Sequence, residues 1–102
     1  MTVGYLTSGV SNTASGTYYE IRPPTASPST EWIIHNIYCG ASATIYFGSS
    51  TATTACVPVY SLSSSGWVTG IFAHVNSVTY LMVKNLGSAS ATFGFDGMVS
   101  RD

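Results

Sequence analysis

The chain has 102 residues and a formal net charge of −1, and 7% of its residues are charged, against about 25% in an average domain. This length fits one domain, and the three Lys and Arg residues are too few and too scattered to neutralise a nucleic-acid backbone. No apolar run approaches the roughly 18 residues of a membrane span, so we expect a soluble domain that binds neither nucleic acid nor membrane.

Residues 1–16 contain few large side chains and many turn-forming residues. Val3, Tyr5 and Leu6 are the exception, because they form a short apolar patch with a strand-like pattern. We predict an N-terminal arm, or a short first strand on a flexible link, that contributes more to partner binding than to folding. The patch would add to the edge of a neighbouring sheet through main-chain hydrogen bonds. The segment lacks the basic and apolar regions of a secretory signal, so we expect none.

Residues 17–102 are predicted to form the folded body, and their apolar side chains recur mainly with the period of two that is typical of strands. This pattern predicts strands over Tyr18–Arg22, Glu31–Cys39, Ala43–Phe47, Trp67–Val75, Thr79–Lys84 and Ser90–Val99. The segment Ala55–Tyr60 is also strand-like, but Pro58 restricts it to a sheet edge or to irregular structure. No window has the spacing of an amphipathic helix.

Two of these segments carry further expectations. Glu31–Cys39 has apolar residues on both faces, which predicts a central strand covered on both sides. With Ala43–Phe47 it is predicted to form a hairpin around the short turn at Gly40–Ser42. Gly70 interrupts Trp67–Val75, where we expect a bulge.

About seven or eight short strands separated by turns predict an all-β, single-domain antiparallel β-sandwich that resembles a jelly roll. A small closed β-barrel is the alternative.

An enzyme needs titratable groups gathered in one pocket, and few are present here. His35 and His74 stand in separate strands. Cys39 is expected on the same strand face as His35, but a His35, Cys39 and His74 metal cluster has no recognisable motif spacing. We predict no catalytic residue, no metal and no cofactor. Cys39 and Cys56 are interpreted as buried thiols, with a disulfide between them as the alternative.

The aromatic residues allow two interpretations. Trp32, Trp67 and the tyrosines either fill a thin core and pair across strands or form a platform on which sugar rings stack. Exposed, coplanar rings beside Asp, Asn or Glu would distinguish the second interpretation from the first.

Several runs of sequence resemble small virion proteins of tailed bacteriophages. They are Tyr19–Pro24, Glu31–Tyr38, Phe72–Val75, Tyr80–Asn85 and Gly94–Gly97. The resemblance implies a structural, non-enzymatic virion protein, made in the host cytoplasm and located on the capsid surface. The role that fits best is a capsid decoration (cement) protein, which binds the major capsid protein, forms trimers and stabilises the shell. A tail or fibre module and a carbohydrate-binding jelly-roll module are the alternatives.

Overall fold

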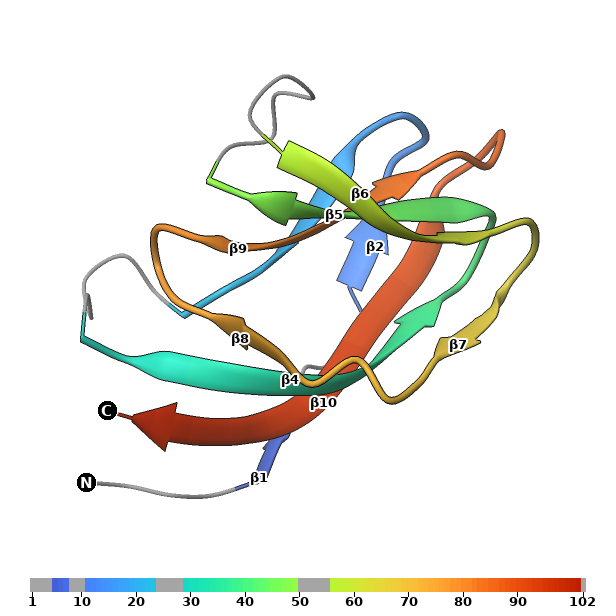
Figure 1. Ribbon diagram of the computed structural model, residues 1–102. Coiled ribbons are helices and arrows are strands. Elements are labelled where there is room, and N and C mark those ends of the chain that lie inside the picture. The colour runs from blue at the N-terminus through green and yellow to red at the C-terminus, as the bar shows by residue number, and fades with distance from the viewer. Residues whose placement is uncertain (1–4, 8–10, 24–28, 50–55, 102) are drawn as a thin grey trace.

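The computed structural model describes residues 5–7, 11–23, 29–49 and 56–101, with the backbone alone for 5–7 and 11. Within these ranges the chain forms two antiparallel sheets and no helix, so no helix could span a membrane (Figure 1). The six-stranded sheet contains β1 (Tyr5–Thr7), β2 (Ser11–Thr13), β4 (Glu31–Cys39), β7 (Gly66–Val68), β8 (Ala73–Val75) and β10 (Ala91–Arg101). The four-stranded sheet contains β3 (Tyr18–Ile21), β5 (Ala43–Gly48), β6 (Cys56–Leu62) and β9 (Tyr80–Asn85).

The strand order confirms the predicted β-sandwich. β1 and β2 pair with successive stretches of β10, and β7 and β8 pair with successive stretches of β4. If each of these two pairs is counted as one interrupted strand, the orders are β1/β2-β10-β4-β7/β8 and β3-β9-β5-β6. This is the arrangement of a jelly roll. The alternative, a closed barrel, is wrong: in the described residues β6 and β7/β8 end their sheets without pairing with each other.

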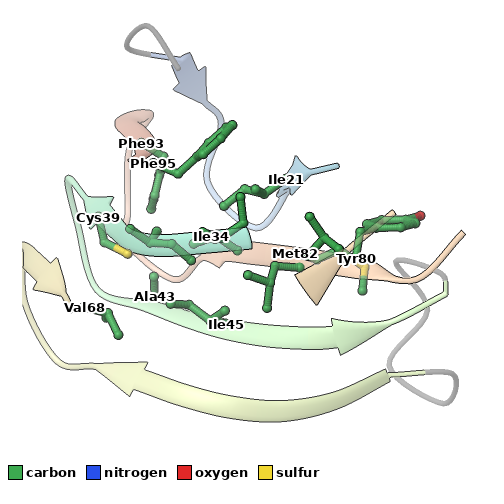
Figure 2. Packing of buried hydrophobic residues seen from close by; sticks show 14 of the residues in the cluster. Ile21, Ile34, Cys39, Ala43, Ile45, Val68, Tyr80, Met82, Phe93 and Phe95 are labelled. Atoms are coloured by element: carbon green, nitrogen blue, oxygen red, sulfur yellow. The ribbon is translucent and has the colours of Figure 1, made fainter. Parts of the chain in front are cut away.

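The core lies between the two sheets, where side chains from both layers meet (Figure 2). Ile34 and Phe93 of the six-stranded sheet are fully buried, and Ile45 of the four-stranded sheet is nearly so. Phe95 is buried beside the half-buried Trp32, and their ring centroids lie 5.8 Å apart. Trp32 therefore points into the sandwich rather than forming part of an external platform.

The predicted hairpin across Gly40–Ser42 is wrong. β4 belongs to the six-stranded sheet and β5 to the other, so the short turn carries the chain from one layer to the next. Both edges of β4 are already occupied, by β10 on one side and by β7 and β8 on the other. β5 instead pairs with β6 and β9.

A β-bulge in β4 changes which residues share a face. The pairing with β10 passes from Asn36–Asp96 directly to Ile34–Gly97, which leaves His35 as an extra residue. β10 approaches β4 so closely here that a Cβ on Gly97 would collide with the Ile33 carbonyl oxygen.

The bulge contradicts the expectation that His35 and Cys39 share a face. Cys39 is fully buried, whereas the His35 ring contacts the exposed Phe72 ring. β4 is a central strand, as predicted, but among the described residues no further layer covers its outer side, where Ile33 and Tyr38 are only half-buried.

The predicted strand Trp67–Val75 is interrupted. Opposite the β4 bulge, residues 69–72 leave the sheet between β7 and β8. Gly70 and Phe72 both adopt a positive φ, of 69° and 50°. Glycine tolerates this conformation, whereas phenylalanine does not favour it. The interruption turns Ile71 toward the gap between the sheets and leaves Phe72 exposed.

The described part of the N-terminal segment is bound to the body. Besides the pairing of β1 and β2 with β10, the buried side chain of Asn85 donates to the Thr13 and Ala89 carbonyl oxygens at 2.9 and 3.0 Å and accepts from the Gly87 amide at 2.8 Å. The Gly16 amide donates to the Asn85 carbonyl oxygen at 2.8 Å. Residues 11–16 therefore differ from the flexible link we expected, because a buried amide needs these main-chain partners.

Candidate functional site

The core-facing side of the four-stranded sheet extends beyond the part that the other sheet covers. Tyr60 of β6 lies opposite Ile45 of β5, and Val57 lies opposite Phe47. Residues opposite each other in an antiparallel pair point to the same side of the sheet. Ile45 is 1% exposed, yet Tyr60 is 39% and Val57 63% exposed. β6 thus presents core-type side chains to solvent.

A hollow of about 290 Å³ lies between the sheets beside β6. Its lining comes from β5, β6, β8, β9 and the link before β8, and consists of Phe47, Val59, Tyr60, Ile71, Ala73 and Leu81. None of these side chains is charged, so a partner that filled the hollow would not have to desolvate an ion. We call β6 and this hollow the open edge.

The main chain of β6 is poorly suited to pairing with a further strand. Pro58 lies within β6 and has no N–H to donate. The register between β5 and β6 also shifts between Ile45 and Tyr46, next to the Tyr46–Pro58 pair. Proline and bulges are common ways of blocking an edge strand. The open edge can therefore bind a partner mainly through its apolar side chains.

The metal-ligating residue types are dispersed in the part of the chain that the structure describes. No group of three His, Cys, Asp or Glu residues could hold a metal ion there. Cys39 and Cys56 are buried thiols rather than a disulfide. Burial raises the pKa of the Cys39 thiol to about 11, which keeps it protonated and poorly nucleophilic at neutral pH.

One polar cluster combines a serine, a histidine and a carboxylate. Ser100 Oγ donates to Glu31 Oε1 at 3.0 Å, and His74 Nδ1 lies 3.3 Å from the same oxygen. The hydrogen bonds from His74 and Ser100, assisted by the charge of Arg101, lower the pKa of Glu31. Both groups contact the carboxylate instead of each other, so His74 is not placed to activate the Ser100 hydroxyl as a nucleophile.

Two of the three predicted partner-binding residues lie on β1, at one edge of the six-stranded sheet. Tyr5 and Leu6 belong to β1, which pairs with Met98 and Gly97 of β10 in the same chain. Val3 lies outside the described residues. β1 ends the strand order, so its outer side has no neighbour among the described strands. A role in partner binding stays a prediction for all three residues.

Sequence reasoning did not single out the open edge, although a signal was present. Val57, Val59 and Tyr60 surround a proline that restricts the segment to a sheet edge. An edge strand that is apolar at successive positions must expose some of those side chains. Exposed apolar edges are where proteins associate.

No protein-family model matches the chain, and no curated protein matches it.

Proposed function

We propose that this protein is a non-enzymatic structural protein of a tailed-bacteriophage virion. Its role would be that of a capsid decoration (cement) protein, which binds the outer capsid surface and stabilises the shell. The observation that carries the proposal is the open edge, where core-facing side chains of β6 lie outside the cover of the other sheet. The resemblance in sequence style to small phage virion proteins supplies the biological setting.

The physical character of the open edge suits a permanent contact. The fully buried core of an interface is depleted in charged residues and enriched in aromatic ones. Tyr60, Val57 and Val59 provide such a core without a charged side chain. A standard interface covers about 800 Å² on each partner, which is roughly one sixth of the 5149 Å² that this chain exposes. The open edge and the surface around it can supply that area.

The small size of the domain favours an oligomer. A domain of 102 residues buries only about two-thirds of its unfolded surface, so association adds to a modest intrinsic stability. We expect the isolated protein to form trimers through heterologous contacts that leave the open edge free to bind the capsid. Sedimentation at micromolar concentration measures this directly, and a persistent monomer would contradict it.

The decisive experiment is binding to capsids. Mass spectrometry of purified virions should detect the chain in a stoichiometric ratio to the major capsid protein. Recombinant protein should also bind capsids that lack it, and the double variant Val59→Asp/Tyr60→Asp should not, because two buried charges without partners oppose docking. Ser88→Asp, an exposed position in the turn before β10, is the matched control and should bind normally.

Absence of the chain from virions would overturn the proposal. Capsid binding by the double aspartate variant at wild-type strength would instead show that the open edge is not the docking surface.

A further inference from the structure

The outer side of the six-stranded sheet carries a second surface, separate from the open edge, which we call the aromatic face. Its residues come from β4, β7, β10 and the link between β7 and β8. They are His35, Asn36, Tyr38, Trp67, Phe72 and Asp96. The face combines supported aromatic rings with a hydrogen-bonded pair of polar side chains.

Two ring pairs form the aromatic part. Tyr38 and Trp67 lie opposite each other on β4 and β7, with ring centroids 5.3 Å apart and planes tilted by 56°. His35 and Phe72 have centroids 4.9 Å apart and a tilt of 51°. In each pair one ring is half-buried and supports a partner that is mostly exposed, at 56% for Trp67 and 62% for Phe72. Rings held in this way lose little conformational freedom when a ligand binds.

The position of Phe72 is held against its own backbone preference. Its φ of 50° lies in the left-handed region, which disfavours a residue with a Cβ. The Ile71 amide donates to the His35 carbonyl oxygen at 2.9 Å and fixes the link at this point. Unfavourable backbone conformations of this kind cluster at binding sites. Here the conformation places an aromatic ring in solvent beside β4.

Asn36 and Asp96 provide the polar part. Asn36 Nδ2 donates to Asp96 Oδ1 at 2.8 Å, and the Gly70 amide donates to Asn36 Oδ1 at 3.3 Å. These bonds orient the Asn36 amide and leave its second N–H and Asp96 Oδ2 without a hydrogen bond to the rest of the described chain. Gly94 lies opposite Tyr38 on β10 and has no side chain.

We propose that the aromatic face is a binding site for a neutral saccharide. The C–H face of a sugar ring would stack on Trp67 or Phe72. One hydroxyl would donate to Asp96 Oδ2, and another would accept from Asn36 Nδ2. An apolar platform with a few fixed polar groups is the general form of a small-molecule site. Because the rings within each pair are tilted, each exposed ring would hold its own sugar unit instead of forming a flat platform.

Charge excludes the main competitors that also stack on aromatic rings. Asp96 on β10 carries a carboxylate at the side of the face formed by β10, and this charge would repel phosphate groups and acidic sugars. Two of the three basic side chains contact aromatic rings of the four-stranded sheet: Arg22 lies over Tyr80 and Lys84 over Tyr18. The third, Arg101, donates to the Ser29 carbonyl oxygen beyond the β8 end of the sheet. The aromatic face thus has no cation that would favour a nucleotide.

The test uses the full chain and neutral oligosaccharides of glucose, galactose, mannose and N-acetylglucosamine at millimolar concentration. We expect at least one of them to change the tryptophan fluorescence and to shift backbone NMR signals of β4 and β7. Trp67→Ala and Asp96→Ala should each weaken that binding about tenfold or more. Tyr60→Ala, on the open edge, is the control and should bind the sugar as the wild type does. Thermal melting verifies that each variant is folded.

The proposal is overturned if no oligosaccharide in the panel binds, or if Trp67→Ala binds as strongly as Tyr60→Ala. It is also overturned if neither the wild type nor Trp67→Ala binds a sugar and Trp67→Ala abolishes self-association or capsid attachment. The face would then be a protein interface. The inference does not rest on the decoration role, and the two fail separately: open-edge variants test capsid binding, and aromatic-face variants test sugar binding.

Discussion

The two edges of the sandwich are built in opposite ways. At the edge where β2 leads into β3, which we call the closed edge, the fully buried Asn85 joins Thr13, Gly87 and Ala89 by hydrogen bonds. At the open edge, Val57 and Tyr60 extend the core-facing side of the sheet into solvent. A buried polar side chain that is hydrogen-bonded within its own chain leaves no donor, acceptor or apolar surface for a partner to contact. Uncovered apolar side chains leave surface that a partner can bury.

This difference separates stability from binding. Variants at the closed edge should unfold the protein, and variants at the open edge should change its associations and little else. Three predictions test this separation, in order of decreasing effect, and a fourth and smaller one concerns a polar cluster outside both edges.

Deletion of residues 1–16 should destabilise the body by about 4 kcal/mol. It removes β1 and β2 from β10 and takes away the Thr13 carbonyl oxygen that Asn85 binds. Chemical denaturation measures the change in the free energy of unfolding. An unchanged midpoint would show that the segment is dispensable for folding, as its composition alone indicated.

Asn85→Leu should cost about 3 kcal/mol, because Thr13, Ala89 and Gly87 would each lose a buried hydrogen-bond partner. Asn12→Leu, at an exposed position in β2, is the control. Part of this cost should disappear in the chain that lacks residues 1–16, where the Thr13 partner is already missing. If the effects of Asn85→Leu and of the deletion on the free energy of unfolding were additive, the connection between Asn85 and residues 1–16 would be contradicted.

Tyr60→Ser should change the free energy of unfolding of the isolated domain by about 1 kcal/mol or less, since the side chain is 39% exposed. Its effect should appear in capsid binding instead, as weaker attachment to capsids that lack the chain. A large loss of stability together with unchanged capsid binding would mean that Tyr60 belongs to the core rather than to a docking surface.

The smallest effect concerns acid. Because hydrogen bonds from His74 and Ser100 lower the pKa of Glu31 below its ordinary 4.5, the folded state favours the carboxylate. This contribution to stability is present above pH 4.5 and is lost as the pH falls below it through the folded-state pKa. In Glu31→Gln the melting temperature should therefore fall less steeply than in the wild type as the pH is lowered below 4.5. An equal decrease in melting temperature for the variant and the wild type would contradict the prediction.

Much of the fold was predictable because it depends on local pattern. The period-two spacing gave the bounds of β4 without error. Pro58 correctly restricted its segment to a sheet edge, because a residue without an N–H is excluded from a central strand. The candidate site was not predictable in the same way: Tyr60 has the same local pattern as a buried core residue.

The sequence by itself determined the all-β class, the sandwich and most strand positions, since alternation and turn residues act over a few neighbouring positions. Only the tertiary structure decided which strands pair, and so turned the expected hairpin at Gly40–Ser42 into a crossing between sheets. It also decided the bulge that separates His35 from Cys39, because one extra residue reverses the alternation beyond it. The exposure of Tyr60 was decided there too: whether a core-facing side chain is buried depends on how far the opposite sheet reaches.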